Sequence, residues 1–258
     1  MNPKVAIIIA NYNYEDYVIK AINSALNQTY DGELRVYVVD DGSSDGSWKK
    51  ISDITEPQAK INMEETYYTG EIEYRQSKNI FAYRIKNSGA STARNVAIWQ
   101  AMEWADMFGI LDSDDEYYPQ KVEKLVSKLK EYPEIGVAYA DYKNVRSEFT
   151  KEELKESYDR NTLYKRCMVH SNSLIKKLFI QQSLLPNREI FDSRLHGPGS
   201  QEFIGCTEDY DLWLRLSKLC IMVHVPECLA IANVHGNNQS SKMTQEIFQK
   251  HAQILGGR

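Results

Sequence analysis

The first half of the chain alternates short apolar runs with segments of helical periodicity, and this alternation limits the possible folds. Apolar runs at 5–10, 34–39, 81–85 and 107–111 are each followed by a polar turn and a helix-like segment. Continuous apolar runs of this length are typical of strands buried on both faces of a parallel sheet. Strands that alternate with helices form right-handed βαβ units. The sequence therefore predicts an α/β protein with a Rossmann-like, mainly parallel sheet flanked by helices.

The rest of the chain has a weaker pattern, and its elements are predicted from local periodicity and composition. Residues 148–160 are highly charged and are expected to form an exposed helix or loop. Residues 56–79 have a less regular pattern, and residues 66–74 within them suggest an added hairpin or a mobile loop without an assigned function. The remaining expectations are a strand at 135–142, ambiguous apolar pieces at 168–175 and 180–185, a loop at 194–205, a helix at 209–219, a strand at 220–225 and a polar loop at 231–241.

Length and composition exclude several classes of protein. A chain of 258 residues fits one domain, which we expect to be divided into halves at 1–117 and 118–258. A formal net charge of −5 gives no electrostatic support for a nucleic-acid partner. No apolar run approaches the roughly 18 residues of a membrane span. The first residues lack a signal-peptide pattern, and the four cysteines show no CxxC spacing, so the expected compartment is cytoplasmic.

Three carboxylates follow the apolar run at 107–111 within four residues. Asp112, Asp114 and Asp115 repel one another unless a cation lies between them. Mg²⁺ and Mn²⁺ prefer oxygen ligands, and Mg²⁺ is commonly held by one or two carboxylates together with substrate phosphates. This stretch therefore predicts a divalent metal site for a phosphate-bearing substrate. The alternative from this stretch alone is an acidic loop that leads into a helix beginning at Pro119.

Polar clusters at 11–13, 40–45 and 87–95 also fall where predicted strands end. In a parallel sheet these ends lie along one edge, where α/β proteins bind their ligands. Residues distant in sequence are therefore expected to line one crevice.

Five motifs stand in one order along the chain and together resemble glycosyltransferase family 2, which has the GT-A fold. They are Ile-Ile-Ile-Ala-Asn-Tyr-Asn at 7–13, Val-Val-Asp-Asp-Gly-Ser-Ser-Asp at 38–45, Asn-Ser-Gly-Ala-Ser-Thr-Ala-Arg-Asn at 87–95, Leu-Asp-Ser-Asp-Asp at 111–115 and Thr-Glu-Asp at 207–209. The resemblance covers residues 4 to 240. It implies hexosyl transfer, as in polysaccharide biosynthesis, from a nucleotide-diphosphate sugar to an acceptor hydroxyl, with inversion at the anomeric carbon.

The resemblance also implies a nucleotide site in the first half. It points to Asp41 as the carboxylate against the base, where it would accept from an imino N–H. Asp40 is the alternative, and both residues are also suited to a turn. Asn11 and Tyr12 would flank the base, and Arg94 would lie beside the nucleotide and its phosphates.

By the same resemblance, Asp112 reaches the ribose, and Asp114 binds the Mn²⁺ or Mg²⁺ that bridges the two phosphates. Asp115 could share either role, and His235 is expected to join the metal or the phosphates. The ion would act as a Lewis acid and neutralise charge on the leaving nucleoside diphosphate.

The general base is expected at the start of the helix at 209–219. Inverting transfer is a direct displacement, so one carboxylate must take the proton of the attacking hydroxyl. Asp209 is the predicted base and Glu208 the alternative. Helix capping by Thr207, with acidic residues in the first turn, is a compatible structural interpretation.

The donor is expected to be a UDP-sugar, and the acceptor a glycan, a lipid-linked sugar or a protein. A lipid-linked acceptor would bring the enzyme to a membrane surface as a peripheral protein. The alternatives are a non-catalytic relative that binds a nucleotide-sugar or glycan, and a sugar-phosphate nucleotidyltransferase. No GxGxxG follows the first apolar run, which argues against a dehydrogenase.

Overall fold

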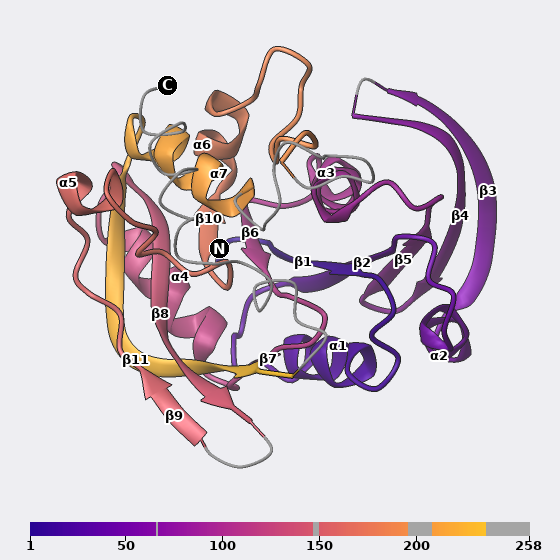
Figure 1. The fold of residues 1–258 in the computed structure, drawn as a ribbon, viewed down its shortest axis with the longest axis horizontal. Helices are drawn as coiled ribbons and strands as arrows, with labels where there is room; N and C mark the ends of the chain where they lie inside the picture. Colours follow the sequence, from indigo (N-terminus) through magenta and orange to yellow (C-terminus); the bar gives the residue numbers. More distant parts are fainter. Residues whose placement is uncertain (66, 147–149, 196–207, 236–258) are drawn as a thin grey trace.

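The computed structural model describes residues 1–65, 67–146, 150–195 and 208–235, arranged as one sheet with helices on both faces (Figure 1). The strands are β1 (Val5–Asn11), β2 (Leu34–Asp40), β3 (Glu56–Glu65), β4 (Tyr68–Ser77), β5 (Ile80–Arg84), β6 (Met107–Ile110), β7 (Glu116–Tyr117), β8 (Ile135–Val145), β9 (Thr150–Glu153), β10 (Leu174–Lys176) and β11 (Ile221–Asn233). The helices are α1 (Val18–Leu26), α2 (Ser47–Asp53), α3 (Ala90–Ala101), α4 (Lys121–Glu131), α5 (Arg160–Leu163), α6 (Lys177–Gln182) and α7 (Glu208–Ser217). Within these residues, no helix has the length and apolar character needed to cross a lipid bilayer.

The strand order is β3-β4-β5-β2-β1-β6-β10-β8-β11-β7, with β9 paired to β8. Strands β5, β2, β1 and β6 are mutually parallel, as the alternating pattern predicted. The chain proceeds from β1 through β2 to β5 on one side and returns to place β6 on the other. The carboxyl ends of β1 and β6 therefore flank a topological switch point, which is where open α/β sheets bind ligands.

The second half of the chain extends the same sheet. Strand β10 runs antiparallel between β6 and β8, and β11 runs parallel to β8. Strand β10 thus joins β6 of the first half to β8 of the second half by backbone hydrogen bonds. The two halves therefore share one sheet.

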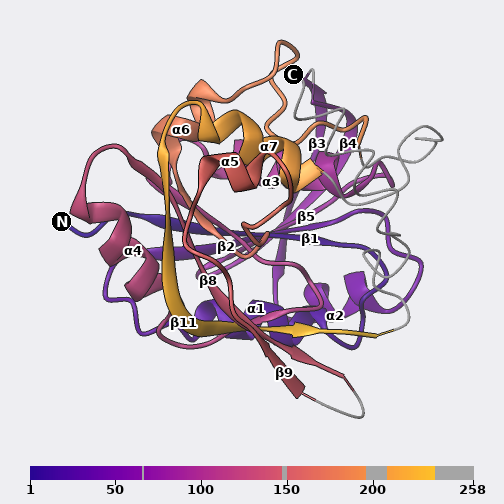
Figure 2. The same ribbon diagram turned by 60° about the vertical axis from the view of Figure 1, so that its left-hand side comes forward.

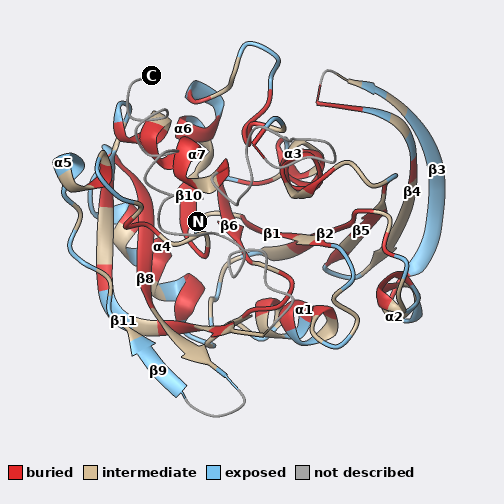
Figure 3. Ribbon diagram, in the orientation of Figure 1, coloured by how far each residue is buried: buried red, intermediate tan, exposed pale blue. Residues whose placement is uncertain are grey.

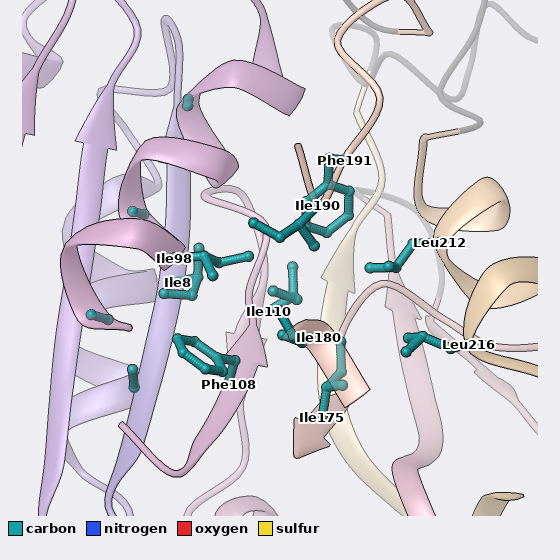
Figure 4. Close-up of a cluster of buried hydrophobic side chains, with 14 of the residues drawn as sticks. Ile8, Ile98, Phe108, Ile110, Ile175, Ile180, Ile190, Phe191, Leu212 and Leu216 are labelled. Atoms are coloured by element: carbon teal, nitrogen blue, oxygen red, sulfur yellow. The ribbon is translucent and has the colours of Figure 1, made fainter. Parts of the chain in front are cut away.

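Side chains that alternate along each strand point to two separate hydrophobic cores. Ile8 of β1 packs on the side of α3, α6 and α7, whereas Ile7 and Ile9 pack on the side of α1 and α4. Figure 2 shows the two helical layers on opposite sides of the sheet. The first core joins α3 to α7 through a continuous set of buried side chains (Figure 4), which includes Ile8, Ile98, Phe108, Ile110, Ile175, Ile180, Ile190, Phe191, Leu212 and Leu216.

In three segments the structure differs from the predicted secondary structure or decides between two predicted alternatives. The charged segment 148–160 contains strand β9, which pairs with β8, because its Lys and Glu side chains can face solvent on an edge strand. The predicted polar loop at 231–241 begins as part of β11, which continues to Asn233. Residues 56–77 form the β3–β4 hairpin, whose outer strand is almost wholly exposed (Figure 3).

The turn of this hairpin is held against α3 by aromatic stacking. The rings of Tyr67 and Trp99 are nearly parallel, with centroids 5.6 Å apart. The guanidinium of Arg188 lies 4.8 Å from the Trp99 ring and forms an ion pair with Glu65. The hairpin therefore extends the sheet through β5 and contacts α3.

Candidate active site

The turn after β2 is fixed to the start of α3 by Asp41. Its carboxylate accepts hydrogen bonds from the backbone N–H groups of Ser88 (2.7 Å) and Gly89 (2.8 Å). Gly42 has φ +71°, and a Cβ there would approach the backbone nitrogen of Asn87 to 2.8 Å, so only glycine fits. Asp41 thus lies directly after the carboxyl end of β2, with part of its hydrogen-bonding capacity used by α3, and its contact with a base stays a prediction.

Asn11 and Asp40 lie beneath this turn. The Asn11 amide donates to the carboxylate of Asp40 (3.0 Å) and to the hydroxyl of Ser43 (3.2 Å). Asp40 is completely buried and also accepts a hydrogen bond from the backbone N–H of Ser43. These surroundings suit a residue that stabilises the turn, and they disfavour the alternative in which Asp40 contacts the nucleotide base. Tyr12, by contrast, is 41% exposed at the rim of the turn, where a ring can lie against a ligand.

Arg94 connects the acidic motif after β6 with the start of α7. Its guanidinium donates to Asp112 (2.8 Å) and to Glu208 (2.6 Å), and it also lies over the ring of Phe191. Burial alone would lower the pKa of Arg94, but the charges of Asp112 and Glu208 outweigh it and raise the pKa. The structure therefore brings together three of the predicted site residues.

Asp112 is held on both of its carboxylate oxygens. Oδ1 accepts from Arg94 and Oδ2 accepts from the hydroxyl of Ser171 (2.7 Å). Burial raises the pKa of Asp112, but the Arg94 charge and the Ser171 hydrogen bond reverse this effect and bring the pKa below its ordinary value. Asp112 is therefore a fixed carboxylate, suited to accept hydrogen bonds from a ribose.

Asp114 and His235 meet although they come from distant parts of the chain. Nε2 of His235 lies 3.3 Å from Oδ2 of Asp114. The imidazole stacks on the ring of Tyr17, with centroids 4.8 Å apart, and meets the edge of Tyr14. Burial lowers the pKa of His235, which favours the neutral imidazole that binds metals.

Asp115 points toward protein donors. Its two carboxylate oxygens accept from the side chain of Asn172 (3.0 Å) and from the backbone N–H of Asn233 (3.2 Å). Burial and the charges of Asp112 and Asp114 raise its pKa well above the ordinary value. The surroundings of Asp115 therefore suit a residue that stabilises the conformation of the acidic motif better than they suit a metal ligand.

A completely buried lysine lies behind Asp115. The ammonium of Lys121 is 4.7 Å from the centroid of the Tyr117 ring, and the residue is 1% exposed. Burial lowers its pKa to about 7, and the charge of Asp115 opposes that effect. Lys121 is thus a buried lysine whose charged form is disfavoured by burial and favoured by Asp115.

The donor set fits a divalent metal that takes most of its ligands from a substrate. Asp114 and His235 offer one carboxylate and one imidazole, and a nucleoside diphosphate would add phosphate oxygens. In the described part of the chain, no group of three or more His, Cys, Asp or Glu side chains could hold a metal by itself. Of the predicted ligands, Asp114 and His235 have the more suitable geometry.

Asp209 stands in the first turn of α7, next to the Arg94–Glu208 pair. Its Oδ1 accepts from the backbone N–H of Tyr210 (2.7 Å). Burial and the charge of Glu208 raise its pKa to about 7, against an opposing effect of Arg94. A carboxylate with this pKa is a competent base near neutral pH. The predicted cap, Thr207, lies outside the described residues.

Sequence reasoning missed the residues that support these groups from 170–172. Ser171 holds Asp112, Asn172 holds Asp115, and His170 packs its ring 4.1 Å from that of Tyr142. The available signal was the polar His-Ser-Asn step that interrupts the apolar segment 168–175. That step puts polar side chains beside the end of β6 because β10, directly after it, pairs with β6.

Comparison with known proteins agrees with the motifs. The family model for glycosyl transferase family 2 matches residues 6–184. An uncharacterized glycosyltransferase of Haemophilus influenzae is 24% identical over 247 residues, which cover 95% of this chain and 69% of that protein. The chondroitin synthase of Escherichia coli is 24% identical over 255 residues, which cover 98% of this chain but 32% of the synthase.

The fold has counterparts among solved structures. The crystal structure of S. aureus TarS 1–349 in complex with UDP superposes with a TM-score of 0.64 at 18% identity, covering 98% of this chain and 64% of that chain. The complex of the same TarS piece with UDP-GlcNAc gives a TM-score of 0.63. The protein therefore spans a little under two thirds of this solved piece, and its fold is of the GT-A type seen in glycosyltransferases. Because the family model matches more than half of its length, the chain belongs to glycosyl transferase family 2.

Proposed function

We propose that this protein is an inverting glycosyltransferase that moves a sugar from a nucleoside-diphosphate donor to an acceptor hydroxyl. One observation carries the proposal: Arg94 hydrogen-bonds both Asp112 and Glu208. That bridge joins Asp112, the predicted ribose contact, to the start of α7, which carries Asp209, and so supports a shared site for donor and base. The TarS complexes with UDP and UDP-GlcNAc support a UDP-sugar as the donor to test first.

Residues 1–117 contribute most of the donor side. Asp41 and the exposed Tyr12 face the base, and Asp112 faces the ribose. Asp114, together with His235 from the second half, would hold Mn²⁺ or Mg²⁺ against the two phosphates. When bound, that ion supplies Lewis-acid stabilisation of the leaving diphosphate.

Residues 118–258 contribute the base and the acceptor side. In the reaction, Asp209 accepts the proton of the acceptor hydroxyl while that oxygen bonds to the anomeric carbon and the bond to the nucleoside diphosphate breaks. Attack from the face opposite the leaving group gives inversion. Arg94 keeps Glu208 in an ion pair, so Asp209 is the carboxylate with the pKa suited to proton transfer.

The acceptor is a hydroxyl of a glycan, a lipid-linked sugar or a protein. We propose that the enzyme works on the cytoplasmic side, and that a lipid-linked acceptor would bring it to the membrane surface. These assignments extend the family membership and rest on the chemistry of the site.

The test is release of UDP from UDP-sugars by the full chain in the presence of Mn²⁺, with and without an acceptor. Asp209→Asn is expected to reduce transfer by about 10²–10⁴-fold, the usual contribution of a general base. The same variant should still bind UDP, as measured by a rise in melting temperature. Full transfer by Asp209→Asn would remove the proposed base. A protein that neither binds nor releases UDP would contradict the donor assignment.

A further inference from the structure

A lysine outside the predicted set, Lys155, is near enough to the proposed base for the charge of Asp209 to act on it. The backbone N–H of Lys155 donates to Asp141 (2.5 Å), which also pairs with His224. Its ammonium lies 5.1 Å from the centroid of the Tyr142 ring. The negative charge of Asp209 acts on Lys155 and raises its pKa, while burial outweighs that effect and lowers the pKa overall.

Lys155 belongs to a continuous set of contacts that leads to the donor side. The rings of Tyr142 and His170 have centroids 4.1 Å apart. Ser171, which follows His170, donates to Asp112. Lys155, Tyr142 and His170 thus connect through Ser171 to Oδ2 of Asp112, whereas Arg94 binds Oδ1 of the same carboxylate.

The half-buried ammonium of Lys155 has no counter-ion among the described residues. No carboxylate lies within ion-pair distance of its Nζ, and Nζ makes no hydrogen bond there. Asp141 binds His224 and Glu153 pairs with Lys151 at 3.1 Å, whereas Asp209 acts on Lys155 from beyond ion-pair distance. A partly desolvated cation without a partner is costly, and one aromatic ring offsets that cost only in part.

We propose that Lys155, Tyr142 and His170 form an acceptor subsite that binds an anionic group, a carboxylate or a phosphate, on the acceptor glycan. The ammonium supplies the charge-assisted hydrogen bonds to the group on the sugar ring, and Tyr142 and His170, which pack against each other, hold the lysine in place. The acceptor hydroxyl next to that ring is then directed at Asp209. The assignment rests on the proposed transferase function, which it makes more specific.

A binding experiment tests the subsite without turnover. Reductive methylation with ¹³C-formaldehyde labels the lysines of the full chain and preserves their charge, and loss of one signal in Lys155→Arg identifies Lys155. Sodium glucuronate, glycerol 1-phosphate and methyl glucoside are then added separately at constant ionic strength. We expect a saturable shift of the Lys155 signal with at least one anion and none with methyl glucoside. Which anion acts distinguishes a uronic acid from a phosphate ester.

The exposed Lys151 on β9 is the matched control, because its ammonium already pairs with Glu153. Absence of a saturable shift with both anions overturns the subsite, as does an equal shift with methyl glucoside or an equal shift at Lys151. A failure to release UDP would count against the transferase function, whereas this titration does not depend on that activity.

Steady-state transfer kinetics give a second test. The acceptor is an oligosaccharide whose terminal residue carries the anionic group that shifts the Lys155 signal. Lys155→Gln should raise the KM for this acceptor about tenfold, the effect of losing one hydrogen bond between charged groups. The KM for the donor should change much less, and Lys155→Arg should restore most of the acceptor affinity. An unchanged acceptor KM in Lys155→Gln overturns the proposal.

Discussion

Arg94 and Glu208 form a buried ion pair that joins helix α3 to helix α7. Their side chains are 11% and 3% exposed, and Nη1 of Arg94 lies 2.6 Å from Oε1 of Glu208. The same guanidinium binds Asp112 through its other terminal nitrogen. One cation thus serves two carboxylates from different parts of the chain, and the relative position of the donor and acceptor sides depends on it.

Replacement of Arg94 by Met should strongly destabilise the protein. The change leaves Glu208 buried without its charge partner, and breaking such a pair costs about 3–5 kcal/mol. Urea unfolding of Arg94→Met should show this loss in the free energy of unfolding. The double variant Arg94→Met/Glu208→Gln should recover part of it, because the amide carries no charge. Equal stability of the single and double variants would contradict the interpretation of this pair.

The metal prediction concerns Asp114 and His235. If both hold the ion, Asp114→Asn and His235→Ala should each weaken Mn²⁺ binding in the presence of UDP, which can be measured by titration calorimetry. Asp115→Asn is the control, because the oxygens of Asp115 already accept from Asn172 and Asn233. Its effect on Mn²⁺ affinity should be the smallest of the three. A larger effect in Asp115→Asn would reverse the assignment within the motif.

Tyr17 should affect metal binding without touching the ion. Its ring stacks on the His235 imidazole and thereby orients Nε2 toward Asp114. Residues that orient a metal ligand typically contribute 10–100-fold to affinity. Tyr17→Ala should therefore weaken Mn²⁺ binding within that range, whereas Tyr17→Phe keeps the ring and should bind normally. Normal affinity in Tyr17→Ala would show that the stack has no orienting role.

The parallel half of the fold could be predicted because its signals are local. Each buried strand is a continuous apolar run, and each ends in polar residues that occupy the sheet edge. The segment around β10 could not be predicted in this way. Three residues, Leu174–Lys176, form this strand, and its position is set by pairing with β6 and β8. Such pairing is a long-range property that no short window of sequence contains.

The same distinction applies to the site. Asp112, Arg94 and Glu208 could be named from motifs, but their roles as one ion-pair network depend on how α7 packs against α3. The sequence offered Glu208 as an alternative base, whereas its pairing with Arg94 makes it a counter-ion. The burial of Lys121 could not be predicted from the sequence either. A lysine in a helix is expected at the surface, and this one is buried.

The pH dependence of transfer should follow Asp209. Its pKa is raised to about 7, and only the deprotonated carboxylate can accept the hydroxyl proton. We expect kcat/KM for the acceptor to fall about tenfold per pH unit below the pKa and to level off above it. Glu208→Gln should move the midpoint to lower pH, because the charge of Glu208 raises the pKa of Asp209. A profile that is flat between pH 5 and 9 would exclude Asp209 as the base.

The same pKa makes a separate prediction for stability. A carboxyl whose pKa is higher in the folded state than its ordinary 3.8 prefers to be protonated there, so its ionisation destabilises the fold. The penalty is absent below pH 3.8, grows as the pH rises toward 7 and is complete above 7. Asp209→Asn cannot ionise and should gain up to about 4 kcal/mol of unfolding free energy at pH 8, but little at pH 3.5. Urea unfolding at both pH values measures the difference. A variant that is less stable than the unsubstituted protein at pH 8 would show that the Asp209 carboxylate stabilises the fold instead.

A charged residue that lowers stability is expected at a catalytic centre. The gain in stability at pH 8 and the loss of transfer should therefore appear in the same variant, Asp209→Asn.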